Sequence, residues 1–141
     1  MNTDFNNWLL QNGLTEVFTT YAKDTFYVNV AKKFGVLKKN GEYRVKSFYL
    51  DDVVGLQIYD DERLTVEWDP VNLWRMYERY TQYSMNELQI RLCLKDQQWR
   101  RIQVVKCLGN NIRRDSAEHV NMLNYACQIA QQVCRSVSET L

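Results

Sequence analysis

The chain is poor in the residues that mark long linkers and metal sites. Its 141 residues include one proline, five glycines and one histidine. So few prolines and glycines exclude a long flexible linker, and the length is that of one ordinary domain. Hydrophobic residues make up 45% and charged residues 25%. Both fractions are near the globular average, which argues against a disordered or fibrous chain.

The chain also lacks an excess of charge of either sign. It has 18 basic and 17 acidic side chains, for a net charge of +1. A dedicated DNA-binding domain carries a clear basic excess. We therefore expect no specific recognition of nucleic acid, while a local basic patch stays possible because net charge says nothing about distribution.

Targeting signals are absent from the first residues. The opening sequence MNTDFNN has neither a basic stretch nor an apolar core, so we expect no signal peptide and a cytoplasmic location. No apolar run approaches the roughly 20 residues that a membrane-spanning helix needs.

Motifs for metal binding and catalysis are missing as well. The four cysteines, Cys93, Cys107, Cys127 and Cys134, form no CxxC pair, so we expect free thiols that pack as small apolar residues. His119 has no nucleophile motif near it, and a packed or capping role is the better interpretation. There is also no phosphate-binding glycine loop or H-E-x-x-H motif. We predict a protein that is not an enzyme and holds no metal or cofactor.

A two-residue hydrophobic period predicts strands from Thr25 onward. Asn40-Gly41 is the strongest short hairpin signal, and a two-residue loop there sets Val36 opposite Val45. A second hairpin is predicted around Asp60-Asp61, and a third pairs 87–95 with 101–108 across the loop 96–100. That loop length would place Leu94 opposite Ile102.

Helices are predicted at the two ends and in the middle of the chain. At the start, residues 1–24 form an N-terminal helical segment, which Asp4 can cap and Gly13 can interrupt, with further helical turns from Thr15. In the middle, a helical insert is expected over 69–86, where Asp69 can cap and Pro70 can open the first turn. At the end, Asp115 or Ser116 caps a helix. Its apolar stripe is formed by Met122, Ala126, Ile129, Val133 and Val137.

The predicted fold is α+β, an antiparallel curved sheet or barrel of about seven strands capped by a C-terminal helix. This order of elements resembles the pleckstrin-homology-like (PH-like) barrel. The run Tyr49–Gly55 followed by Ile58 is similar to the "DI-x-x-(Y/F)-E" turn of uncharacterised bacterial PH-like proteins. The runs 88–92 and 102–104, and Asp115-Ser116 before the last helix, are similar to the last third of that family.

The chain also departs from that family. The cysteine-pair zinc ribbon and glycine-rich insert of many members are absent, and 69–86 stands where the insert would be. The resemblance implies a PH-like domain over 25–141 and a binding role rather than catalysis, with phosphoinositides, peptides or proteins as partners.

Two groups of residues are candidate sites. Aromatic and arginine side chains could bind another protein or a second copy of the chain through Trp74, Arg75, Tyr77, Arg79, Tyr80, Trp99 and Arg100. Basic side chains could bind anionic lipid headgroups weakly through Lys38, Lys39, Arg100 and Arg101. In each group the alternative is that the residues are structural: packed aromatics, or lysines that protect a strand edge.

A non-catalytic binding or adaptor domain is therefore the first functional hypothesis, with protein–protein interaction as its activity. The alternatives are a peripheral binder of anionic lipid and, third, a small-ligand carrier or small enzyme with a pocket under 69–83.

Overall fold

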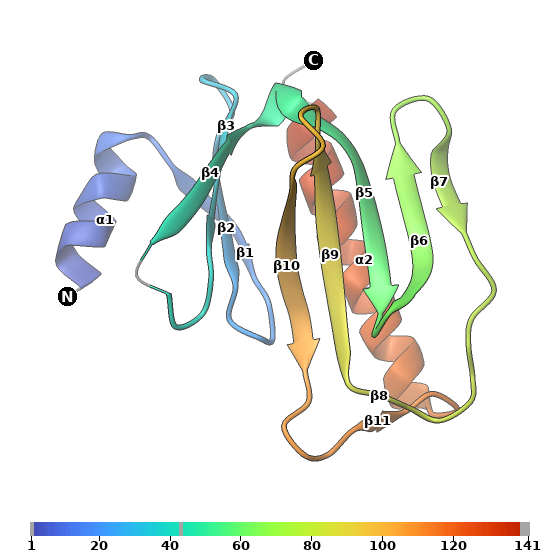
Figure 1. Cartoon of the computed structure of the whole chain (residues 1–141). Helices are drawn as coiled ribbons and strands as arrows, with labels where there is room; N and C mark the ends of the chain where they lie inside the picture. The colour runs from blue at the N-terminus through green and yellow to red at the C-terminus, as the bar shows by residue number, and fades with distance from the viewer. Residues whose placement is uncertain (1, 43, 139–141) are drawn as a thin grey trace.

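The computed structural model describes residues 2–42 and 44–138 as an α+β fold (Figure 1). Its strands form a four-stranded sheet, a five-stranded sheet and a two-stranded ribbon, all antiparallel. A helix stands at each end of the chain. The prediction of antiparallel sheets with a C-terminal helix is confirmed, but the sheets do not close into a barrel within the described ranges.

The four-stranded sheet runs in chain order through β1 (Thr15–Thr19), β2 (Thr25–Asn29), β3 (Phe34–Lys38) and β4 (Val45–Tyr49). Alternation gives the sheet two apolar faces. One face supplies Phe26 and Phe48 to the main core. The other packs Val36 against Leu9 of the helix α1 (Asn2–Gln11).

The helical turns predicted from Thr15 are wrong, because Thr15–Thr19 is strand β1. Threonine, valine and phenylalanine favour a pleated surface, and Phe18 alternates into the core beside Phe26. Since β1 pairs with β2, the predicted boundary between 24 and 25 falls inside a hairpin.

The hairpin at Asn40-Gly41 exists, with a register different from the predicted one. Glu42 N–H donates to the carbonyl of Lys39 (3.2 Å), and Gly41 has a φ of 78°, as a tight turn needs. Beyond the turn Val36 pairs with Ser47 rather than with Val45. This shift of two residues keeps every side chain on its predicted face.

The five-stranded sheet has the order β10-β9-β5-β6-β7. A 3-10 turn, Leu50–Asp52, leads into β5 (Val53–Asp60) and β6 (Arg63–Asp69). The other strands are β7 (Leu73–Met76), β9 (Glu87–Leu94) and β10 (Trp99–Lys106). Ile102 pairs with Ile90 rather than lying opposite Leu94, and this even shift again keeps the apolar face.

The C-terminal helix α2 (Ala117–Ser138) packs on β5 and β9 and lies behind them in Figure 1. Its N-cap is Ser116, whose Oγ accepts the N–H of His119 (3.2 Å). Ala126, Ile129 and Val133 of the predicted stripe are buried in the main core with strands of both sheets. A short ribbon of β8 (Ser84–Met85) and β11 (Ile112–Arg113) precedes the helix.

The helical insert predicted over 69–86 is wrong. The segment contains β7 and β8, and 77–83 is irregular. Leu73 has a φ of 58°, which a right-handed helix cannot contain. The aromatic side chains instead favour the extended chain that adds a strand to β6.

Candidate interaction surface

A tight turn between β6 and β7 creates an edge strand. One oxygen of Asp69, Oδ1, accepts the backbone N–H of Val71 (2.9 Å) and of Asn72 (2.7 Å). The backbone hydrogen bond from Asn72 is the main reason why the pKa of Asp69 lies below its ordinary value. The turn returns the chain antiparallel to β6, so that Trp74 pairs with Trp68 and Met76 with Val66. β7 is thereby the last strand of the sheet.

The backbone of β7 presents hydrogen-bonding groups outward. Tyr77 N–H donates to the carbonyl of Thr65 on β6 (2.9 Å). In an antiparallel pair the groups of alternate residues point to opposite sides. The backbone N–H and C=O of Arg75 therefore face β6, and those of Trp74 and Met76 face the free edge. These groups can accept a further strand.

The side chains of this edge are large, apolar and open to solvent. The exposed fraction is 59% for Leu73, 38% for Trp74 and 77% for Met76. The one charged residue of β7, Arg75, turns away from the edge and binds Glu67 on the outer face of the sheet (2.6 Å). Natural edge strands are blunted by outward charges, prolines or covering elements, and none of these blunts β7 within the described ranges.

A groove of about 200 Å³ lies between this edge and α2. Val66 and Met76 line it from the sheet, and Val120, Leu123 and Cys127 line it from the helix. The groove exists because one helix, about 10 Å wide, cannot cover five strands spaced about 4.8 Å apart. Side chains of an added strand that share a face with Met76 would point toward this groove.

The structure divides the predicted aromatic and arginine group between two regions. Trp74, Arg75 and Tyr77 lie at the β7 edge, and the Tyr77 hydroxyl donates to Glu67 (3.1 Å). Arg79 lines the groove. Tyr80 is half-buried, and its ring centre lies 4.6 Å from the guanidinium carbon of Arg63.

Trp99 and Arg100 lie at the other end of the sheet, on β10. Arg100 points toward β4, where it shares a shallow depression with Phe48 and Tyr49. The predicted protein-binding group is therefore not one surface, and its β7 part is the coherent one.

The predicted lipid-binding group is also not one free surface. The ammonium of Lys39 binds the buried carboxylate of Asp24 and the carbonyl of Arg101 (2.8 Å for the latter). Lys38 donates to two backbone carbonyls of its own turn. Arg100 and Arg101 are neighbours on one strand and point to opposite faces.

A buried polar network that the sequence did not reveal fixes the segment after β7. Arg114 donates to both carboxylate oxygens of Asp60 (2.9–3.2 Å) and to Asp61 (2.6 Å). His119 Nε2 lies 2.8 Å from Asp60 Oδ2. The hydrogen bond with Asp60 is the main cause that raises the pKa of Arg114. Arg114 also donates to the carbonyl of Gln82 (3.1 Å) and so holds the segment 77–83.

His119 and Asp60 are paired as in a catalytic His–Asp dyad, but both side chains are closed off from solvent. His119 and Asp60 are 0% and 1% exposed, and the Nδ1 atom of His119 is buried without a hydrogen-bond partner in the described part of the chain. The packed histidine predicted from the sequence is confirmed. Arg114, the cation of the network, is buried as well.

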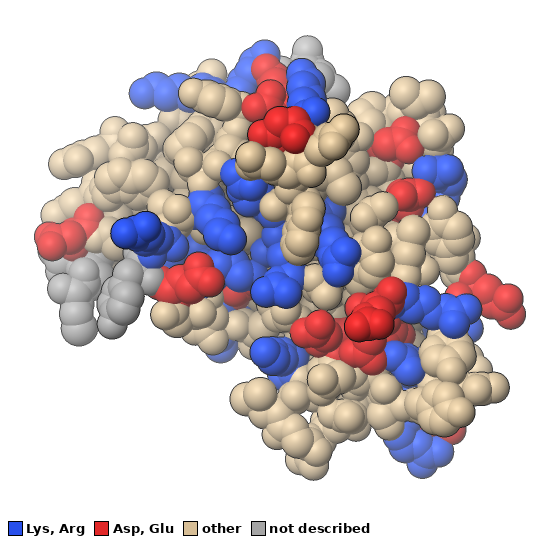
Figure 2. All heavy atoms as spheres, viewed as in Figure 1, with Lys and Arg blue, Asp and Glu red and all other residues tan. Residues whose placement is uncertain are grey.

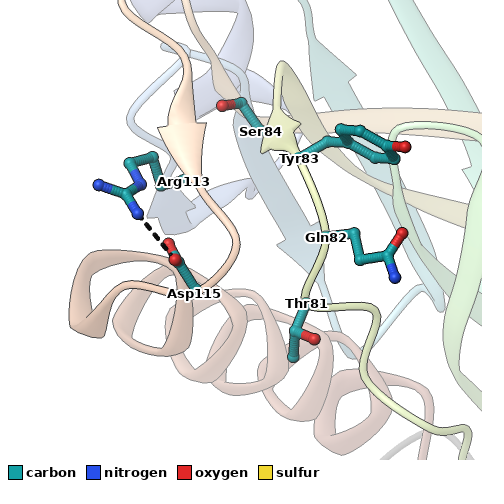
Figure 3. A pocket seen from close by; sticks show the side chains of 6 residues that line it. All are labelled: Thr81, Gln82, Tyr83, Ser84, Arg113 and Asp115. Carbon is teal, nitrogen blue, oxygen red and sulfur yellow. Dashed lines mark hydrogen bonds and ion pairs between the residues drawn. The ribbon is translucent and has the colours of Figure 1, made fainter.

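A wide, open depression of about 590 Å³ lies over the segment 81–84 and the start of α2 (Figure 3). Its lining is polar, and an exposed ion pair between Arg113 and Asp115 (2.8 Å) occupies one side. Figure 3 shows Gln82 and Tyr83 pointing away from that ion pair. The side chains do not converge on a common point, so this depression is a weaker candidate than the groove.

Residues 2–42 and 44–138 contain no cluster of three or more His, Cys, Asp or Glu side chains that could hold a metal ion. The cysteines are free thiols. No helix within these ranges is both long and apolar enough to span a membrane.

No protein-family model, curated protein or solved structure matches this chain.

Proposed function

We propose that this protein is a non-catalytic interaction domain that binds an extended segment of a partner protein as an added strand along β7. The outward N–H and C=O groups of Trp74 and Met76 carry this proposal. Strand addition takes its affinity from main-chain hydrogen bonds and its specificity from pockets for alternate side chains. Here the groove beside α2 supplies such a pocket.

The groove also defines the chemistry of the partner segment. Side chains that pack against Val66, Leu123 and Cys127 must be apolar, because these residues offer no charge, whereas Arg79 adds a positive charge elsewhere on the lining. On the outer face the partner meets Arg75, which Glu67 already neutralises. A segment that alternates apolar and polar residues fits both faces.

We further propose that the domain is PH-like and acts in the cytoplasm. Two antiparallel sheets that share a core with a C-terminal helix support the first part. The strand order β10-β9-β5-β6-β7 does not follow the chain, so an experimental structure compared with PH-like domains is the test. Fractionation of the native host tests the location.

Peptide selection tests strand addition directly. Random peptides displayed on phage are selected on the wild-type protein, and their affinity is measured for Met76→Lys and Leu108→Lys variants. Leu108 is a matched control, since it is 89% exposed and lies beyond β10. We expect alternating apolar peptides whose affinity falls at least tenfold, about 1.4 kcal/mol, with Met76→Lys and is unchanged with Leu108→Lys.

Hydrogen exchange gives a second readout on the same complexes. Bound peptide should slow the exchange of the Trp74 and Met76 amides. Equal binding to both variants, or no protection at these amides, would rule out strand addition. Light scattering in the absence of peptide shows whether a second copy occupies the edge.

A further inference from the structure

The outer face of the five-stranded sheet carries two arginines directly opposite each other. Arg101 on β10 pairs with Arg91 on β9. Like charges at directly opposed positions destabilise a sheet. Arg75, Arg113 and Arg114 bind carboxylates of the chain, whereas Arg91 and Arg101 form no ion pair with any described residue. A chain that keeps this repulsion on an uncovered face leaves two guanidinium groups ready for an external anion.

Arg91 is held in a fixed orientation. Its guanidinium carbon lies 4.0 Å from the ring centre of Tyr59 and 5.0 Å from that of Trp99. Its Nε lies 3.4 Å from Gln89 Oε1, which leaves the two terminal nitrogens for a ligand. Trp99 is 50% exposed, so a part of its indole ring also remains available.

Basic side chains continue from Arg101 into a neighbouring cleft of about 420 Å³. Lys23 and Lys106 line this cleft together with two acidic residues, the buried Asp24, which is already bound by Lys39, and the exposed Glu42. Figure 2 shows basic side chains gathered over the middle of this face, with acidic side chains just below them. The acidic border suits a narrow anionic ligand rather than a broad anionic plane such as a membrane.

We propose that this surface binds single-stranded nucleic acid without sequence preference. Phosphates contact Arg91, Arg101 and Lys106, and a base stacks on Trp99. Proteins that hold single strands combine a basic track with aromatic platforms, and an open sheet is a common support for them. The site is independent of strand addition, because β10 and β7 are opposite edges of the sheet.

Fluorescence anisotropy with a short fluorescein-labelled oligothymidine tests the proposal. Arg101→Gln should weaken binding at low salt at least about fivefold and reduce the slope of log K against log salt by about 0.7, the value for one phosphate contact on a single strand. Arg135→Gln removes the same charge from the exposed face of α2 and should leave the affinity unchanged. Trp99→Ala should also weaken binding.

Thermal unfolding separates a binding role from a structural one. Removal of one of two opposed arginines should raise the Tm of the free protein by about 1–5 °C, so Arg101→Gln should be more stable and bind less. A lower Tm together with lost binding would overturn the proposal. Equal losses with Arg101→Gln and Arg135→Gln would also overturn it. So would preferential binding to phosphatidylserine vesicles or polyglutamate with no binding to the oligonucleotide.

Discussion

The two edges of the five-stranded sheet differ in how their backbone groups are satisfied. Along β10, Asp24 accepts the N–H of Gln103 (2.8 Å), Thr20 donates to the Gln103 carbonyl (2.6 Å), and Lys39 donates to the Arg101 carbonyl. All three side chains come from the four-stranded sheet and its turns. Along β7 no side chain from residues 2–42 or 44–138 makes a comparable hydrogen bond to the outward groups of Trp74 and Met76. Of the two edges of this sheet, β7 is therefore the one that can accept a further strand.

The largest effect is expected from a substitution that removes the cover of the β10 edge. Asp24→Ala should lower the free energy of unfolding by about 3–5 kcal/mol, because it leaves the Lys39 ammonium buried without its carboxylate. The side chains of Asp24 and Lys39 are 3% and 12% exposed. Urea denaturation measures the change.

Asp115→Ala is the matched control for Asp24→Ala, since it removes an ion pair whose side chains are 54% and 75% exposed. It should cost at most about 1 kcal/mol. A similar small cost for Asp24→Ala would show that the covered edge does not depend on this carboxylate.

This edge chemistry shows what the sequence could and could not predict. Local periodicity identified β5, β6, β9, β10 and α2, because a period of two or of 3.6 residues reports burial of one face. The errors in register were even, as for Ile102, since faces constrain a register only to multiples of two. Contacts that join distant residues leave no local signal. Asp24 and Gln103 are 79 positions apart, and His119 and Asp60 are 59 apart.

The prediction of a helix over 69–86 is wrong for a different reason. Trp74, Tyr77 and Tyr80 recur every three residues, and this spacing, close to the helical period, favours a helix. Arg75 and Tyr77 instead bind Glu67, which lies 8 and 10 positions earlier. The exposed aromatics could be found from the sequence, but the strand that presents them depends on a pairing with β6 that periodicity does not encode.

Two cysteines of α2 differ in burial, Cys134 in the core and Cys127 at the open groove, and we expect their reactivity to differ accordingly. Burial raises the pKa of the Cys134 thiol to about 12 from its ordinary 9.0. At pH 8 this lowers its thiolate fraction about a thousandfold, since each pKa unit is a factor of ten. Cys127, whose pKa burial also raises, lines the open groove. We therefore expect iodoacetamide to modify Cys127 before Cys134, as peptide mass mapping over time would show.

The same pKa shift makes stability depend on alkaline pH. The folded state holds the Cys134 proton more tightly than the unfolded state, so this contribution is complete below about pH 9 and is lost as pH rises toward 12. A Cys134→Ala variant should show less of this alkaline loss. Faster modification of Cys134 than of Cys127 would contradict the burial seen on the covered side.

The smallest effect comes from a proline placed at the open edge. Met76→Pro removes an N–H that points outward and leaves the pairing with β6 intact, so we expect a cost of about 1 kcal/mol or less. Arg75→Pro removes an N–H that points toward β6 and should cost about 3 kcal/mol. The two residues are adjacent on one exposed strand. Because Arg75→Pro also deletes the ion pair with Glu67, the cost of Arg75→Ala is subtracted before the two proline variants are compared. Thermal unfolding measures both costs. If Met76→Pro were the more damaging change, the outward groups would belong to the fold, and β7 would have no free donors to offer a partner.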